Sequence, residues 1–135
     1  MGSVRSTDCR VDHPPRKGNL MQYLLLIYQN EAEMKSAADG TMMADYVTFT
    51  QDIIRNGNFK AGDALQSTTT ATTVRVREGK TLTTDGPFAE TREQLGGYYL
   101  IEAKDLDEAI AIAARVPSAR IGSIEVRPIK VFNPG

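Results

Sequence analysis

The stretch from Thr84 to Tyr99 gathers the side chains of this chain that are best placed for chemistry. It reads Thr-Asp-Gly-Pro-Phe-Ala-Glu-Thr-Arg-Glu-Gln-Leu-Gly-Gly-Tyr-Tyr. Asp85-Gly86-Pro87 predicts a turn, because Asp bonds to its own backbone, Gly accepts a positive φ and Pro fixes φ. A carboxylate held in such a turn and backed by Phe88 would be partly desolvated, which suits proton transfer or the binding of a cationic or hydroxylic group. Asp85 is therefore the candidate catalytic residue.

A purely structural interpretation of the same residues stays open. The Asp85 side chain would then cap its turn, or the start of a short helix over Phe88 to Gln94. The charged residues Glu90, Arg92 and Glu93 would form an ion-pair network around a cleft, or simply solvate a surface.

The glycine pair Gly96-Gly97 precedes an aromatic strand and also has two interpretations. It lets a ligand approach the backbone, or it allows a bulge. The phenols of Tyr98 and Tyr99 would hydrogen-bond a ligand there, or serve as core or interface aromatics. The candidate ligand-binding residues are Gly86, Pro87, Phe88, Glu90, Gly96, Gly97 and Tyr98.

The motif in this stretch resembles the signature of the DGPF proteins, a branch of the YCII-related family. The likeness rests on Asp85-Gly86-Pro87-Phe88 followed by Glu90, Glu93, Gly96-Gly97 and Tyr98. It extends from about Gln22 to Phe132 and takes in Ala61-Gly62, the run from Ala71 to Arg75, and the run from Ser123 to Pro128.

The resemblance implies a small-molecule-binding domain without a cofactor, and leaves open whether it is an enzyme using proton transfer at Asp85. Some YCII-related enzymes use a His with an Asp, but no histidine occurs between Met21 and Gly135, so that half of the pair cannot be carried over. Acid/base work would fall to Asp85 with a carboxylate or a tyrosine. An alternative from the same resemblance is a regulatory or interaction protein that accompanies an alternative sigma factor in transcription.

Composition excludes several other classes. The 16 basic and 17 acidic residues are interspersed and give a net charge of −1, so binding of nucleic acid through charge is not expected. His13 and Cys9 are the only imidazole and thiol, and both precede the domain, which argues against a zinc site. A single cysteine and the lack of an apolar spanning run or export signal predict a cytoplasmic protein that does not enter a membrane.

Hydrophobic patterning divides the chain into three parts. Residues 1–20 have hardly an apolar side chain to bury and predict a flexible extension, 21–132 form the domain, and 133–135 are a frayed end. Strands are expected at Gln22 to Tyr28, Phe59 to Leu65, Leu95 to Glu102 and from Ile124 to about Phe132.

Two helices and one hairpin fill the gaps between these strands. Residues at helical spacing predict a helix that begins at Thr41 and ends at Asn56-Gly57. One side of this helix carries Met43, Tyr46, Val47, Thr50, Ile53 and Ile54. A second helix begins at Asp105 as N-cap with Glu108 three residues later, and Pro117 ends it.

The hairpin covers Thr72 to Thr84, with Val74 and Val76 on one face and Leu82 as the inward candidate of its second strand. Arg75 and Arg77 lie on the other face, where they bind an anionic substrate or pair with acidic residues across the sheet.

This order predicts an α+β, ferredoxin-like fold with a mostly antiparallel sheet, two main helices on one face and an added hairpin. The resemblance implies the dimeric α/β-barrel variant, in which two sheets pack face to face. The uncovered sheet face would otherwise be a large apolar patch, so a homodimer is expected.

Overall fold

The computed structural model describes residues 20–33 and 40–130 and confirms the α+β class with a mostly antiparallel sheet. Strands β1 (Met21–Gln29), β2 (Phe59–Ala64), β5 (Gln94–Ala103) and β6 (Ser123–Pro128) form a four-stranded sheet in the order β2-β5-β1-β6. Every neighbouring pair in it is antiparallel, an arrangement compatible with the ferredoxin-like fold.

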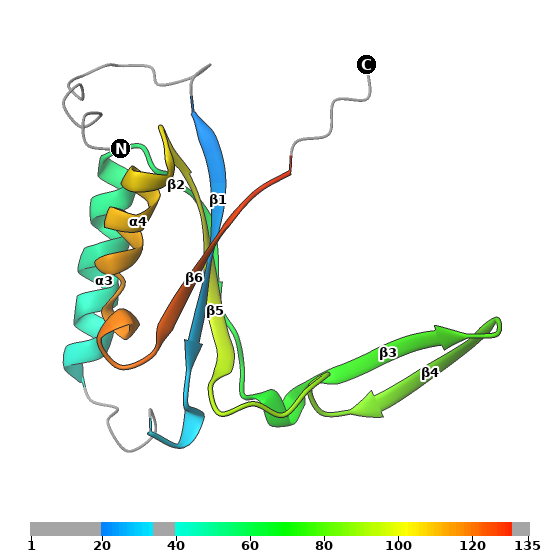
Figure 1. Ribbon diagram of the computed structural model, residues 1–135. Coiled ribbons are helices and arrows are strands. Elements are labelled where there is room, and N and C mark those ends of the chain that lie inside the picture. The colour runs from blue at the N-terminus through cyan, green and yellow to red at the C-terminus, as the bar shows by residue number, and fades with distance from the viewer. Residues whose placement is uncertain (1–19, 34–39, 131–135) are drawn as a thin grey trace, which may run out of the picture.

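Helices α3 (Gly40–Arg55) and α4 (Leu106–Ala114) both cover the same face of this sheet, as expected (Figure 1). Short 3-10 helices, η1 (Thr68–Thr70) and η2 (Pro117–Arg120), join the larger elements. Asp105 caps α4 by accepting a hydrogen bond from the Glu108 amide at 2.9 Å, which confirms the predicted N-cap. Gly57 ends α3 with a φ of 82°, a left-handed conformation that glycine adopts without strain.

The core lies between the helices and the sheet. Alternate residues of β1 and β5 point into it, and so do the inner faces of α3 and α4. Full burial of each large apolar side chain contributes about 1.5–3 kcal/mol relative to exposure. The buried hydrophobic residues are Tyr23, Leu25, Ile27, Phe49, Ile53, Tyr99, Ile101, Ala103, Ala109, Ile112, Ala113 and Val116.

The buried stripe of α3 differs from the one predicted from the sequence. Phe49 and Ile53 are buried, whereas Met43, Val47 and Ile54 are 68%, 49% and 54% exposed. Phe49 packs edge-on against Tyr99 with ring centroids 5.3 Å apart, so the larger aromatic ring sets the rotation of the helix. The exposed residues lie on its outer side.

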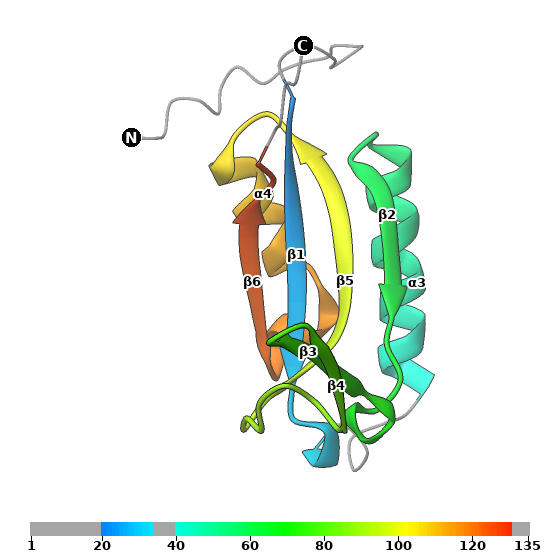
Figure 2. The same cartoon turned by 90° about the vertical axis from the view of Figure 1, so that its right-hand side faces the viewer.

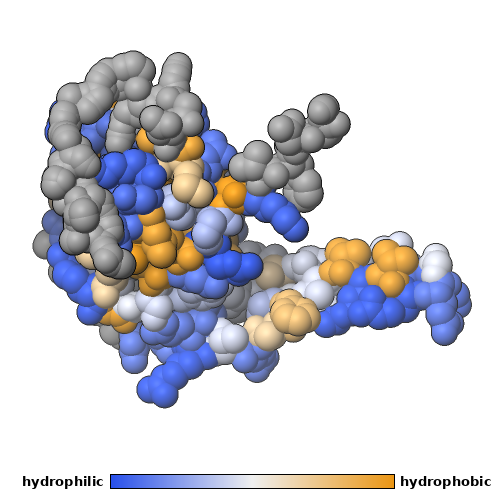
Figure 3. Space-filling model, turned by 45° about the horizontal axis from the view of Figure 1, so that its top comes forward, coloured by the Kyte–Doolittle hydropathy of each residue, from blue (hydrophilic) through white to orange (hydrophobic). Residues whose placement is uncertain are grey.

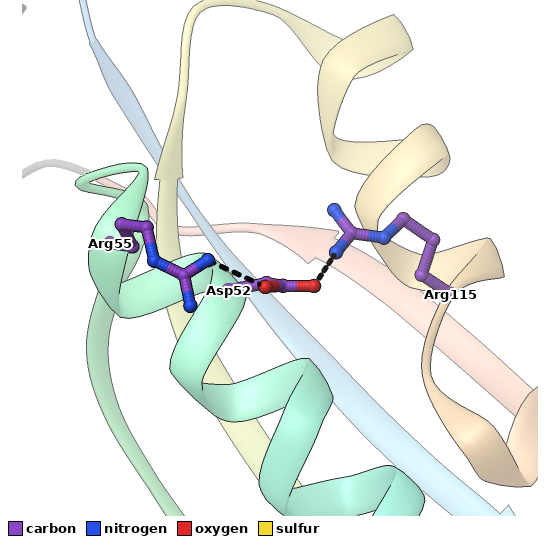
Figure 4. Close-up of polar contacts among 3 residues, drawn as sticks. All are labelled: Asp52, Arg55 and Arg115. Atoms are coloured by element: carbon purple, nitrogen blue, oxygen red, sulfur yellow. Dashed lines mark hydrogen bonds and ion pairs between the residues drawn. The ribbon is translucent and has the colours of Figure 1, made fainter.

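Asp52 ties the two helices together at their outer surface (Figure 4). One carboxylate oxygen lies 2.9 Å from Arg55 Nη1 and the other 3.0 Å from Nη2 of Arg115, the C-cap residue of α4. These partners are substantially exposed, so each pair contributes at most about 1 kcal/mol.

Hydrogen bonds centred on the buried Ser118 also connect the layers. Tyr46 donates its hydroxyl hydrogen to Ser118 Oγ at 2.6 Å, and Ser118 donates to Gln29 Oε1 at 2.8 Å. Because Ser118 is fully buried, loss of either bond would leave an unsatisfied polar group at a cost of about 1–3 kcal/mol. This chain of bonds links α3, η2 and β1.

Strands β3 (Thr72–Arg77) and β4 (Lys80–Asp85) form a separate two-stranded sheet, the predicted hairpin. We call residues 72–85 the arm. It leaves the lower end of the main sheet and projects on the side opposite the helices (Figures 1 and 2). The sheet face on that side, the open face, is covered by no helix of the described chain.

Gly122 is a position where a side chain has no room. A Cβ atom there would lie inside van der Waals contact with the Tyr28 carbonyl oxygen of β1. We expect Gly122→Ala to lower the free energy of unfolding by about 1–3 kcal/mol, since the backbone of β1 would have to shift. Urea denaturation measures this change.

The matched control is Gly79→Asn at the tip of the arm. Gly79 has a φ of 77° and open space around it, and Asn tolerates this conformation, so stability should change little. Equal effects of the two substitutions would contradict the account of Gly122.

Candidate functional site

The open face combines apolar side chains with a few polar ones. Alternation along β1 turns Leu24, Leu26 and Tyr28 away from the helices, and each is half-buried. Leu24 lies opposite Leu100 and Leu26 opposite Tyr98 across the β1–β5 pairing. Apolar neighbours at this spacing make a continuous surface, of the kind that binds a ligand or another protein.

A tyrosine and a carboxylate pair on this face. Tyr98 donates its hydroxyl hydrogen to Asp63 Oδ2 at 2.8 Å, from the neighbouring strand β2. This hydrogen bond, followed by the negative charge of Asp63, raises the pKa of Tyr98 above its ordinary value of 10.0. Tyr98 is therefore a neutral hydroxyl at physiological pH, able to orient Asp63 or a bound hydroxyl group.

A second phenol lies on the same face near the bottom of β1. Partial desolvation, then the charge of Glu125 on β6, raises the pKa of Tyr28 from 10.0. Glu125 sits opposite Leu26 in the β1–β6 pairing. The lower half of the open face thus carries two neutral phenols, each beside a carboxylate.

Asp85 is the last residue of β4 and lies where the arm joins the body. The turn after it is closed by other groups: the Gly86 amide donates to the Ala71 carbonyl at 2.7 Å, and Thr73 Oγ1 donates to the Gly86 carbonyl at 2.9 Å. Gly86 has a φ of 103°. Among residues 20–33 and 40–130, no hydrogen bond or ion pair of the Asp85 side chain is found, and it is exposed in the single chain.

The predicted helix over Phe88 to Gln94 is wrong. Residues 86–93 form bends without helical hydrogen bonding, and β5 already begins at Gln94. Side chains fix this loop instead: Thr91 donates to the Glu93 carbonyl, and Asn30 donates to the Arg92 carbonyl at 2.9 Å.

Other predicted site residues occupy this loop and its surroundings. Pro87 and Glu90 are exposed, and Phe88 is 77% exposed with the Arg75 guanidinium 5.5 Å from its ring centroid. Glu93 accepts a hydrogen bond from Ser123 at 2.9 Å.

Gly96 and Gly97 have a structural explanation. The β1–β5 pairing shifts register between Ile27 and Tyr28, opposite this pair, which is the predicted bulge. A Cβ on Gly96 would meet the Gln29 side chain at 2.7 Å, and one on Gly97 would meet the Asp63 carbonyl at 3.0 Å. Tyr99 turns to the core, where its hydroxyl lies 2.7 Å from Thr50 Oγ1.

Sequence reasoning missed Asp63, Tyr28 and Glu31. Asp63 meets Tyr98 only through the strand register, which no sequence pattern indicates. Glu31 accepts hydrogen bonds from the Thr68 amide at 2.9 Å, and from the hydroxyls of Thr68 and Ser67. The hydrogen bond from the Thr68 backbone amide is the main reason that the pKa of Glu31 lies below its usual 4.5. It ties the loop after β1 to η1, at the foot of the arm.

Two further features concern the described residues as a set. Across 20–33 and 40–130, no three His, Cys, Asp or Glu side chains lie close enough together to hold a metal ion. The helices in these ranges are too short or too polar to cross a membrane.

Comparison with known proteins adds two findings. The sequence of residues 21–133 matches the family model of the YCII-related domain. An uncharacterized protein of Rhizobium meliloti (strain 1021) is 38% identical over 120 residues, which cover 85% of this chain and 97% of that protein.

The Tyr98–Asp63 pair makes a prediction about alkaline pH. A raised pKa means that the folded state holds the phenol proton more tightly, so this contribution to stability is present below about pH 10 and is lost as pH rises through the folded pKa. In Asp63→Asn the titration midpoint of Tyr98 should fall toward 10.0. Ring-carbon NMR, with the resonance assigned through Tyr98→Phe, measures it.

Glu78→Gln, a charge removal at the tip of the arm, serves as control and should leave the midpoint in place. An unchanged Tyr98 midpoint in Asp63→Asn would mean that the pair is not formed in solution.

Proposed function

Since this chain belongs to the YCII-related family, we propose that it is a small-molecule-binding protein of the DGPF type, acting by proton transfer at Asp85 without a cofactor. The proposed site is the lower end of the open face together with the foot of the arm. Asp85 is the proposed catalytic residue.

The observation that carries this proposal is that the Asp85 carboxylate makes no hydrogen bond or ion pair within residues 20–33 and 40–130. Its turn is closed by the Gly86 amide and by Thr73, so the side chain is not needed for the fold. A carboxylate that the described structure leaves without a partner, on a turn held by backbone hydrogen bonds, is available to bind or to deprotonate a ligand. None of the hydrogen bonds that close this turn comes from the Asp85 side chain, so the alternative capping role is not supported.

The other residues would orient the ligand. Tyr98 and Asp63 offer a hydroxyl and a carboxylate joined at 2.8 Å. Leu26 and Leu100 supply apolar area beside them. Such a site suits a small molecule with an apolar part and a hydroxyl or other polar head. Gly86, Pro87 and Phe88 would hold Asp85 in place, with Gly96, Gly97 and Glu90 lying along the same stretch of chain.

Homodimerisation belongs to this proposal. The open face is apolar in its middle, and a second copy stacked on it would remove that surface from water. Stacking would also exclude water from the polar residues at its lower end, which raises the strength of their electrostatic interactions.

The ligand-binding proposal is tested by thermal shift against a library of metabolites. We expect at least one compound to raise the melting temperature of the wild type, and Asp85→Asn and Tyr98→Phe to reduce that shift. Each shift is measured against the unliganded form of the same variant, because Tyr98→Phe also removes the hydrogen bond to Asp63. Asp107→Asn removes a carboxylate from α4, on the helix-covered side of the sheet, and should retain the full shift. A library without any binder, or identical shifts in Asp85→Asn and the wild type, would refute the proposal.

A protein partner is a second candidate function, favoured by the outer side of α3. Met43, Val47 and Ile54 share that side and are each about half exposed or more. The sigma-factor association implied by the family resemblance would use such a surface. Affinity purification from the native host tests it: Val47→Glu should abolish capture of a transcription protein, and recovery of the homodimer alone would argue against this function.

A further inference from the structure

The arm has two unlike faces. One face of the β3–β4 ladder, which we call the valine face, carries Thr72, Val74 and Val76 of β3. Their partners across the ladder, on the same face, are Asp85, Thr83 and Thr81 of β4. Arg75 and Arg77 stand opposite Leu82 and Lys80 on the other, cationic face. The expected inward position of Leu82 is therefore wrong: it is 48% exposed and lies beside the arginines.

Within residues 20–33 and 40–130, the side-chain contacts identified between the arm and the rest of the chain lie on the cationic face. Thr73 on the cationic face bonds to Gly86, and Arg75 stacks on Phe88. On the valine face, Val74 and Val76 are 57% and 59% exposed. Figure 3 shows the resulting hydrophobic surface along the upper side of the arm, above a hydrophilic one.

An isolated two-stranded hairpin is at best marginally stable in water. Packing of another surface against the exposed valine face would therefore stabilise the arm. The open face of the main sheet is a second apolar surface that no helix of the described residues covers, and the arm projects from its lower end (Figure 2). Both surfaces therefore border the same corner of the molecule. A twofold axis would bring each surface of one copy against the other copy, so two such L-shaped subunits would bury both surfaces at once.

The length of the arm supports a second copy as the cover. Each of its strands has six residues, about 20 Å at the usual rise per residue. Two sheets stacked face to face lie about 10 Å apart. An arm that leaves one sheet on its open side is thus long enough to cross that gap and to lie against the body of the second copy.

We propose that the arm of each subunit docks on the second copy through its valine face and thereby completes the site. Asp85 belongs to the valine face, so docking carries its carboxylate into the interface between subunits. This supplies the desolvation that the single chain does not give, since Asp85 is exposed there. The inference rests on the proposed homodimer and deepens it by making the site shared.

Equilibrium sedimentation compares the wild type with two variants. Val74→Lys/Val76→Lys places charges on the valine face and should raise the dimer dissociation constant at least about tenfold. Leu82→Lys makes the same kind of change on the cationic face and should leave the constant within about twofold. A monomeric wild type, or a larger effect of Leu82→Lys, would overturn the proposal.

Photo-cross-linking gives a measurement that does not depend on the stability of a variant. With p-benzoylphenylalanine at position 76, irradiation of the dimer should give a covalent dimer, whereas the same group at position 77 should give much less. A sedimenting dimer that yields no covalent product at position 76 would overturn arm docking and leave the homodimer standing. Ligand binding is measured separately by thermal shift, so a failure of arm docking would not by itself refute the proposed function.

Discussion

The structure depends on a sheet that is apolar on both faces and covered by helices on one. Period-two alternation along β1 sends Tyr23, Leu25 and Ile27 into the helix-covered core and Leu24 and Leu26 to the other side. Apolar residues on both sides are typical of strands whose two faces are both covered. The helices cover half of this apolar surface, and no helix of residues 20–33 and 40–130 covers the remaining half.

The candidate site lies on that remaining half. The residues of the site do not come from one motif: Asp85 sits at the foot of the arm, while Tyr98 and Asp63 meet across β5 and β2. The motif Asp85-Gly86-Pro87-Phe88 builds a turn closed by Thr73 and the backbone, which frees its carboxylate from a structural task. The glycines that follow serve the pairing of β5 with both of its neighbours.

Local signals were sufficient for much of the fold. The Asp105 cap, the Gly57 stop and the hairpin follow from interactions within a few residues, and the structure confirms all three. The rotation of α3 could not be predicted from spacing, because Phe49 and the flanking aliphatics all fit a helical period and tertiary packing against Tyr99 decides between them. The Tyr98–Asp63 pair depends on strand register, and residues 86–93 are held by contacts from distant segments such as Asn30, so neither is visible locally.

The arm has a consequence for how proteins of this design can diverge. It is inserted between β2 and β5, which pair directly with each other, and it shares no ladder with them. The ladders of the main sheet therefore contain no residue of the hairpin. Substitutions on the two faces of the arm can change what the arm contacts without altering the pairing of the four-stranded sheet.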